Sequence, residues 1–295
     1  MKRRKPVHRI IPWRKTMLTE RELLSNRRRC DQDQFPYQME ILMPKANTIA
    51  IVTGGSRGLG RATVEALARR GVSSILTYHT NKSAAAEVVE SVQRSGARAV
   101  ALQLDTGDTH TFPAFADEVL RVLHEWGAER FNYLVNMAGT SHEGLFGEVT
   151  EEDFDAAYRI HAKGPFFLTQ TLLPLIAEGG RIINISSGLT RFAYPGRITY
   201  AAMKGAVEVM THYMAKELGP RRIAVNTVAP GAIQTDFSGG MVRDNPDIAR
   251  HIAETTALGR PGLPEDIGPM IASLLSEDNR WVNAQRIEVS GGQLI

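Results

Sequence analysis

Seven short, largely apolar segments alternate with helix-like segments from residue 48 onward, and this alternation limits the possible folds more than any other feature. The apolar segments are residues 48–53, 73–78, 97–104, 131–137, 180–186, 221–229 and 286–292. Strands that are apolar on both faces indicate a parallel sheet covered by helices on each side. We therefore expect an α/β fold: residues 48–295 form one domain with a doubly wound, seven-stranded parallel sheet.

The segments between the strands have helical spacing, and several end at a glycine, a common stop signal for helices. They predict helices over residues 60–71, 83–96, 151–178 and 198–219. Doubly wound sheets bind ligands beyond the carboxyl ends of their strands. The loops at that edge are therefore where we expect the functional residues.

The basic character of the chain is confined to its N-terminal part. Residues 1–43 contain 11 Lys and Arg against 5 Asp and Glu, whereas the remainder contains 24 against 27. The body is mildly acidic, so it lacks the charge signature of nucleic-acid binding. We interpret residues 1–47 as a basic extension. It could be a disordered arm for anionic partners, a targeting segment, or the product of a misassigned start before Met39 or Met43.

Several classes of protein are disfavoured by composition. No run of 18 apolar residues occurs, so no membrane span is expected. The single cysteine, Cys30, cannot form an internal disulfide, which suits the reducing cytoplasm. No cluster of Cys, His and Asp has metal-ligand spacing, so no metal is expected.

The segment "TGGSRGLG" follows the first strand and precedes the first helix. Its glycines allow a tight turn and a close approach of the backbone to a ligand, and the amide groups of the next helix can face a pyrophosphate. A tight turn without a ligand is the alternative, but the strand and helix on either side favour dinucleotide binding. The candidate cofactor-binding residues in this segment are Thr53, Gly54, Ser56, Arg57, Gly58, Leu59 and Gly60.

The residues after the second strand bear on which dinucleotide is bound. An NAD site usually offers an acidic residue to the ribose hydroxyls there. This chain has Tyr78, His79 and Thr80 instead, and Arg57 lies inside the glycine-rich loop. A nearby cation without a carboxylate suits the 2′-phosphate, so we expect NADP(H) in preference to NAD(H), with Tyr78 and His79 as further contacts. Arg57 could also be an ordinary solvated loop charge.

Tyr200 and Lys204 stand four residues apart in "YAAMK", on one face of a predicted helix. A phenol can donate a proton, but its pKa near 10 is about three units too high for efficient transfer at pH 7. Correcting it takes roughly 4 kcal/mol, which one ammonium at about 4 Å supplies at an effective dielectric constant of about 20. Ser187 follows the fifth strand and could hold a substrate oxygen, although a serine there often caps a turn.

Taken in order, these motifs resemble the short-chain dehydrogenase/reductase (SDR) family over nearly all of residues 48–294. The glycine-rich loop, "NMAG" at 136–139, Ser187 with "YAAMK", and "PGAIQT" at 230–235 match the family pattern, with Met137 in place of an asparagine. The resemblance implies a Rossmann fold and hydride transfer between NADP(H) and a carbonyl/alcohol pair. The further cofactor contacts that it implies are Asp105, Thr106, Asn136, Ala138, Gly139, Tyr200, Lys204, Pro230, Gly231, Ile233 and Thr235.

The C-terminal part of the domain resembles the branch that contains 3-oxoacyl-[acyl-carrier-protein] reductases, which also holds glucose, quinone and xenobiotic carbonyl reductases. The resemblance implies a small carbonyl/alcohol or acyl thioester substrate and a homotetramer or homodimer. Tyr200 would be the general acid, Lys204 would lower its pKa and bind the nicotinamide ribose, and Ser187 would position the carbonyl oxygen. A catalytically silent NADP(H)-binding sensor of the same fold is the alternative.

His161 departs from the family pattern, which has an asparagine at this position in "N-x-K-G", where this chain has "HAKG". In the family the asparagine holds a kinked helix and links the lysine to solvent through a water molecule. Imidazole can donate and accept hydrogen bonds, so we expect a neutral His161 to complete that relay. A purely structural role and a weakened activity are the alternatives.

Three segments are expected to form the substrate side, and the first is residues 141–146, which follow the fourth strand. Residues 188–194 lie between Ser187 and Tyr200 and should form one wall, and residues 237–252 have the glycine pair and length of a mobile lid. Arg191 in the segment 188–194 could meet an acidic substrate or face solvent.

Overall fold

The computed structural model of the protein describes residues 47–295. The basic extension therefore lies outside the described residues, apart from its last residue, as do Cys30 and the two methionines considered as alternative starts.

The seven strands lie in one parallel sheet, which confirms the predicted fold class. The sheet order is β3-β2-β1-β4-β5-β6-β7, and every neighbouring pair is parallel. The strands are β1 (Ile49–Val52), β2 (Ser73–Tyr78), β3 (Ala99–Gln103), β4 (Phe131–Asn136), β5 (Ile176–Ile185), β6 (Ala224–Pro230) and β7 (Arg286–Val289). The order reverses between β1 and β4, and such a switch point opens a crevice at the carboxyl ends of the strands.

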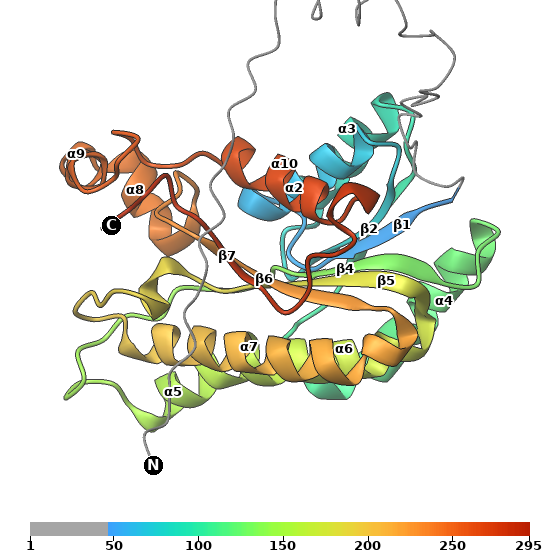
Figure 1. Cartoon of the computed structure of the whole chain (residues 1–295), viewed down its shortest axis with the longest axis horizontal. Helices are drawn as coiled ribbons and strands as arrows, with labels where there is room; N and C mark the ends of the chain where they lie inside the picture. The colour runs from blue at the N-terminus through green and yellow to red at the C-terminus, as the bar shows by residue number, and fades with distance from the viewer. Residues whose placement is uncertain (1–46) are drawn as a thin grey trace, which may run out of the picture. The chain divides into compact units, whose positions relative to one another are not determined.

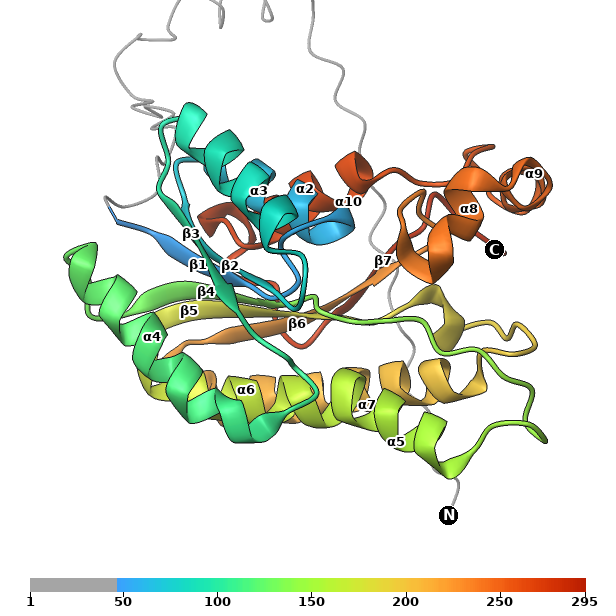
Figure 2. The same ribbon diagram turned by 180° about the vertical axis from the view of Figure 1, so that it is seen from behind.

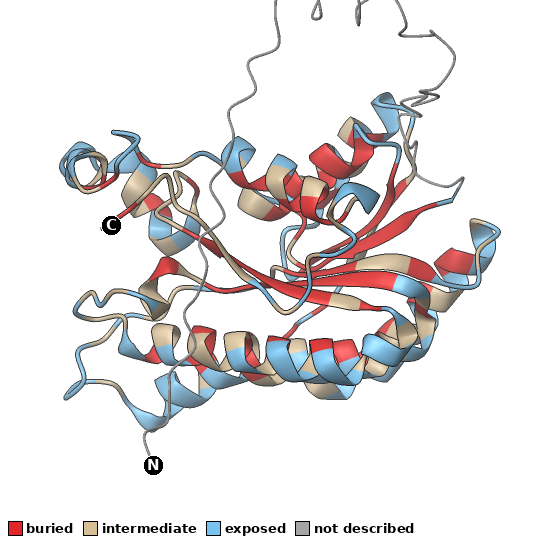
Figure 3. Cartoon of the chain, viewed as in Figure 1, coloured by how far each residue is buried: buried red, intermediate tan, exposed pale blue. Residues whose placement is uncertain are grey.

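Helices cover both faces of the sheet (Figures 1 and 2). One face carries α2 (Gly58–Ala68), α3 (Lys82–Arg94) and α10 (Pro264–Leu274), and the other carries α4 (Phe112–Glu125), α6 (Gly164–Leu172) and α7 (Ile198–Glu217). Figure 3 shows that the strands between the two layers are largely buried. Each face has its own hydrophobic cluster, so the sheet is packed on both sides as the apolar strands predicted.

Two of these helices were not predicted from the sequence. In α4 the buried residues Phe112, Phe115, Val119 and Leu123 follow helical spacing, so the pattern was present but not assigned. In α10 the apolar face packs against α2, and Gly268 permits a close approach because a Cβ there would lie 2.4 Å from the carbonyl oxygen of Ala62.

The helix predicted over 151–178 is divided into several parts. It consists of α5 (Glu151–Tyr158), a π-helical turn (Arg159–Lys163), α6, and a 3-10 turn (Leu173–Leu175), after which β5 begins. Gly164 donates its N–H to the carbonyl of Arg159, and a Cβ on Gly164 would lie 2.2 Å from the carbonyl oxygen of Thr106. The wide turn therefore lets the helix pass the loop after β3, and π-turns of this kind are frequent at functional sites.

After β6 the chain forms two short helices, α8 (Met241–Asp244) and α9 (Pro246–Glu254), next to the loops at the carboxyl edge of the sheet. Ser238, Gly239 and Gly240 before α8 all have positive φ, which permits a sharp reversal. Within residues 47–295, no helix is long and apolar enough to cross a membrane, and no group of three or more His, Cys, Asp or Glu could hold a metal ion.

Candidate active site

One cavity of about 1160 Å³ lies beyond the carboxyl ends of the strands and gathers most of the predicted site residues. It is bounded by the glycine-rich loop, the loops after β2 to β6, and the segment leading into α8 and α9. The predicted residues that line it are Gly54, Ser56, Arg57, Gly58, Leu59, Gly60, Tyr78, His79, Asp105, Thr106, Ala138, Gly139, His161, Ser187, Tyr200, Lys204, Pro230, Gly231, Ile233 and Thr235.

The glycine-rich loop forms a cradle that side chains would fill. A Cβ on Gly60 would lie 2.1 Å from the carbonyl oxygen of Gly54, and a Cβ on Gly54 would lie 3.0 Å from Cα of Ala138. Arg57 is the residue before α2, and its side chain does not cap the helix. The amide groups at the start of α2 are thus available to an anion, which fits the pyrophosphate of a dinucleotide.

Thr53 and Asn136, both predicted as cofactor contacts, do not line the cavity. The Thr53 hydroxyl accepts hydrogen bonds from the N–H groups of Met137 (2.9 Å) and Ala138 (3.0 Å). The Asn136 amide donates to Thr169 and Asn184. Both side chains are buried: Thr53 holds the loop after β4 in place, and Asn136 ties the end of β4 to α6 and β5.

Arg57 is predicted as a cofactor contact, with an ordinary loop charge as the alternative, and in the structure it forms an ion pair. Its guanidinium lies 2.6 Å from the Asp236 carboxylate, which belongs to the loop after β6. His79, after β2, lies 3.6 Å from Asp105, after β3. The glycine-rich loop is therefore linked to the loop after β6, and the loops after β2 and β3 lie close together.

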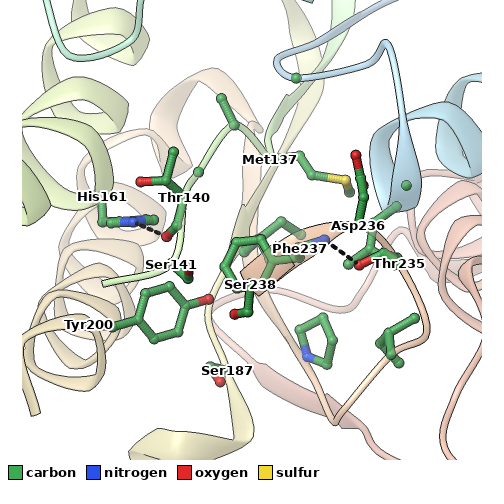
Figure 4. A pocket seen from close by; sticks show the side chains of 18 of the residues that line it. Met137, Thr140, Ser141, His161, Ser187, Tyr200, Thr235, Asp236, Phe237 and Ser238 are labelled. Carbon is green, nitrogen blue, oxygen red and sulfur yellow. Dashed lines mark hydrogen bonds between the residues drawn. The ribbon is translucent and has the colours of Figure 1, made fainter. Parts of the chain in front are cut away.

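Ser187, Tyr200 and Lys204 meet at one side of the cavity; Figure 4 shows Tyr200 and Ser187 there beside His161. The Ser187 Oγ accepts a hydrogen bond from the N–H of Leu189 (3.2 Å), so its own proton remains available for a substrate oxygen. The Lys204 Nζ donates to the carbonyl of Ile185 (2.8 Å) and lies 5.4 Å from the centre of the Tyr200 ring.

Burial is the main influence on the pKa values of Tyr200 and Lys204. Burial raises the pKa of the Tyr200 phenol, and the charge that opposes this is Arg197, one turn earlier in the chain. Burial also lowers the pKa of Lys204 to about 8. Tyr200 is therefore held in its protonated form, the form that a general acid in reduction requires.

His161 sits in the π-helical turn, almost fully buried, with its ring edge-on to Tyr200 at 5.0 Å between centres. Its Nε2 lies 2.8 Å from the carbonyl oxygen of Thr140 (Figure 4). A carbonyl oxygen only accepts, so Nε2 carries the hydrogen and Nδ1 carries a lone pair. Within residues 47–295, that Nδ1 has no hydrogen-bond partner. Burial, then the charges of Lys204 and His142, lower the pKa of His161 to about 2, so the ring is neutral.

Aromatic and sulfur-containing side chains line the substrate side of the cavity. Phe192, Tyr194, Phe237, Met241 and His251 line it. The Tyr194 hydroxyl lies 2.9 Å from His251 Nε2, so the wall after β5 contacts α9. The predicted wall and lid segments thus do border the cavity, but no sequence motif indicated which of their side chains would face it.

Arg191 in this wall neither lines the cavity nor faces only solvent. Its guanidinium binds the Glu288 carboxylate, at 2.6 Å for the closer pair of atoms. Two further bonds go to the main-chain carbonyls of Gln293 and Leu294. This replaces the interpretation of Arg191 as a substrate contact.

A doubly wound parallel sheet with a dinucleotide cradle and a Ser, Tyr and Lys set defines the class of SDR-type oxidoreductases, and comparison with known proteins agrees. The family model described as enoyl-(acyl carrier protein) reductase matches residues 54–293. A hydroxynaphthalene reductase-like protein of Metarhizium brunneum is 33% identical over 260 residues, covering 84% of this chain and 96% of its own.

Solved structures agree closely as well. The angucycline C-6 ketoreductase LanV with bound NADP has a TM-score of 0.79 and 40% identity, covering 84% of this chain and 95% of its own. The promiscuous reductase LugOII catalyses keto-reduction at C1 during lugdunomycin biosynthesis. Its structure has a TM-score of 0.78 and 39% identity, covering 84% of this chain and 98% of its own. The chain therefore belongs to the short-chain dehydrogenase/reductase family, whose members interconvert carbonyl and hydroxyl groups.

Proposed function

We propose that the protein is an NADPH-dependent reductase that converts a ketone into an alcohol. The observation that carries the proposal is the meeting of Ser187, Tyr200 and Lys204 in one cavity with the glycine cradle. Bound NADPH would supply the hydride. Fold similarity alone would not assign the reaction, but this set of residues supports it.

Each of the three residues has one task in this proposal. Ser187 donates its free proton as a hydrogen bond to the ketone oxygen, and Tyr200 transfers its phenolic proton to the same oxygen as charge develops there. Lys204 holds its position through the carbonyl of Ile185, and its ammonium stabilises the phenolate that remains. General acid catalysis of this type contributes about 10²- to 10⁴-fold in rate.

Two observations favour NADP(H) over NAD(H) as the cofactor. Arg57 lies in the glycine-rich loop at the cavity, and β2 ends at Tyr78 and is followed by His79 and Thr80, without an acidic residue. The similarity to LanV, solved with bound NADP, points in the same direction.

We propose an aromatic or polycyclic ketone as the substrate class. The aromatic wall formed by Phe192, Tyr194 and Phe237 suits a flat ring system, because offset and edge-on ring contacts add to area burial. The similarity to a hydroxynaphthalene reductase-like protein and to the ketoreductases LanV and LugOII supports the same class. The 3-oxoacyl thioester suggested by the sequence remains the competing substrate.

The test is NADPH and NADH oxidation at 340 nm over a panel of hydroxynaphthalenones, polycyclic quinones, 3-oxoacyl thioesters and simple ketones. Tyr200→Phe should lose at least about 10²-fold in kcat, because the general acid is gone. Tyr213→Phe is the matched control, since Tyr213 lies on the same helix but is 67% exposed. NADPH binding without turnover of any ketone would contradict the proposal and support the sensor alternative.

We further propose that neutral His161 takes the place of the family's asparagine. Its unpartnered Nδ1 can accept a hydrogen bond from a water molecule, much as an amide oxygen can, whereas its low pKa excludes a charged relay at neutral pH. His161→Asn should therefore retain most of the activity. A loss of more than about tenfold would mean that the imidazole itself takes part in the reaction.

We also propose a homodimer or homotetramer and a cytoplasmic location. The assembly is supported by exposed apolar side chains on α6 and α7, among them Phe166, Phe167 and Val209. Light scattering of the purified chain would measure the mass, and a monomer would contradict this. The single cysteine supports the location.

A further inference from the structure

Behind Ser187 lies a set of charged side chains that the proposed reaction does not use. Glu208 is on α7, one turn after Lys204, and is 18% exposed. Its Oε1 lies 2.6 Å from the Ser186 hydroxyl, 2.8 Å from the Thr190 hydroxyl and 2.7 Å from Nε of Arg286. Ser186 and Thr190 flank Ser187 in the chain, so one carboxylate oxygen holds both sides of the loop that carries it.

Arg286 extends these contacts to Ser187 itself. It projects from β7, and its side chain is 24% exposed. One terminal nitrogen lies 3.3 Å from the carbonyl oxygen of Ser187 and 3.1 Å from the Thr190 hydroxyl. The other lies 3.0 Å from Glu288. The planar, forked guanidinium can make these bonds together, which a lysine ammonium at the same place could not.

Glu288 connects this group to the C-terminal residues. It binds Arg286 and Arg191, and hydrogen bonding from Arg191 is the main reason that its pKa is lowered to about 2. Arg191 in turn binds the carbonyls of Gln293 and Leu294. The Gln293 side chain accepts from the N–H of Ala232 in the loop after β6. The loop carrying Ser187 is thus tied to a second cavity loop through the end of the chain.

We propose that the Glu208–Arg286 pair positions Ser187 for the reaction, with Glu288 and Arg191 supporting it from outside. The inference rests on the proposed function, in which Ser187 holds the ketone oxygen. Exposed ion pairs contribute little, but both carboxylates here are mostly buried and are also held by hydroxyl groups. The geometry that they fix matters because a misplacement of about 1 Å in an active site can cost about 10²-fold in rate.

The test is a double-mutant cycle with the best ketone from the panel. Glu208→Ala should lower kcat by about tenfold and leave the Kd of NADPH unchanged, because the carboxylate acts through Ser187 and not on the cofactor. In the Ser187→Ala background the same change should lower kcat by less than about twofold. Glu208→Gln keeps an oxygen for Ser186 and Thr190, so its kcat should lie between those of Glu208→Ala and the unchanged chain.

Arg286→Lys provides a second measurement if Glu208→Ala does not fold, and it should also lower kcat without changing NADPH binding. Arg221→Lys is the matched control: Arg221 binds Glu178 and two main-chain carbonyls, and its side chain is 27% exposed, but it lies in the turn Gly219–Arg221 that follows the C-terminal end of α7. This control should keep the kcat of the unchanged chain.

The results separate the inference from the proposed function. Equal losses from Glu208→Ala with and without Ser187 would overturn the positioning role while leaving the reductase intact. Full activity of Ser187→Ala would remove the proposed role of Ser187, and the inference would be overturned with it. A loss of kcat in Arg221→Lys as large as in Arg286→Lys would show that any such ion pair matters only for general stability.

Discussion

The cavity has two halves that are built in different ways. The nucleotide half, around the glycine-rich loop and the start of α2, is shaped by the backbone: Gly54 has φ of +64°, and Gly60 leaves no room for a Cβ. The substrate half, around residues 188–197 and 237–254, is shaped by side chains such as Phe192, Tyr194 and Phe237. One half thus needs particular glycines, whereas the other tolerates many combinations of side chains.

This difference explains which features are shared with relatives and which are specific. A pyrophosphate is the same in every dinucleotide, so one backbone shape serves the whole family. Substrates differ, and loops that present different side chains can bind them on an unchanged scaffold. Changes in the nucleotide half should therefore affect all substrates equally, and changes in the substrate half should alter the ranking among them.

The largest effect is expected from Gly60→Ala. The new Cβ would overlap the carbonyl oxygen of Gly54 at 2.1 Å, so the cradle must open. We expect the affinity for NADPH to fall by about a hundredfold, equivalent to about 3 kcal/mol of binding free energy. The effect should be the same whichever substrate of the panel is assayed. Fluorescence titration with NADPH measures this. Gly219→Ala is the control, because a Cβ there meets nothing within 4 Å. Normal binding by Gly60→Ala would refute the view that the backbone shapes this half.

A second prediction concerns His161, whose ring lies against Gly139. The folded chain holds His161 neutral with a pKa of about 2, whereas an unfolded histidine has a pKa near 6.5. Its contribution to stability is therefore complete above pH 6.5 and declines as the pH falls below that value. Between pH 7 and pH 5 the unfolding free energy should fall by about 2 kcal/mol more than in His161→Asn.

Urea unfolding at several pH values provides this measurement. His124→Asn, which changes an exposed histidine on α4, should follow the unchanged chain. If the unfolding free energies of the unchanged chain and of His161→Asn depend on pH in the same way, protonation of the buried ring does not reduce stability.

The two halves also differ in how far they could be predicted. The strands, the glycine cradle and the shared helix face of Tyr200 and Lys204 follow from local periodicity and spacing, and the structure contains them. The pairing of Arg57 with Asp236, 179 residues away, depends on how loops after different strands meet, which no local pattern encodes. The same holds for Glu208, whose partners come from the loop after β5 and from β7.

The π-helical turn around His161 is an instructive case. Pro165 predicted a local bend, but the position of the turn depends on the carbonyl of Thr106, which leaves room only for a glycine at 164. The tautomer of His161 likewise depends on a carbonyl from another loop. The sequence identifies His161 as a departure from the family pattern, but it does not indicate which ring nitrogen carries the hydrogen.

A third prediction concerns the charge of Lys204 and the pH dependence of the reaction. Burial lowers its pKa to about 8, so its ammonium is lost as the pH rises through that value, while the raised pKa of Tyr200 keeps the phenol protonated. We expect kcat for reduction to fall by about tenfold per pH unit above pH 8. In Lys204→Arg the charge persists, so the lower remaining activity should show no such decline up to pH 10. The same decline in both proteins would assign it to another group.

The smallest effect is expected at the contact between the halves, where Arg57 of the glycine-rich loop binds Asp236 of the substrate-side segment. To bind a 2′-phosphate, Arg57 must share or leave this carboxylate. Both side chains are well exposed, so the pair contributes no more than about 1 kcal/mol. Asp236→Asn should therefore tighten NADPH binding by about two- to fivefold and leave NADH binding nearly unchanged.

The control is Asp244→Asn, which removes a charge paired with Arg243. An equal gain for both cofactors would mean that Asp236 repels the shared pyrophosphate and does not compete for Arg57. The specificity for NADPH would then reside in the loop after β2.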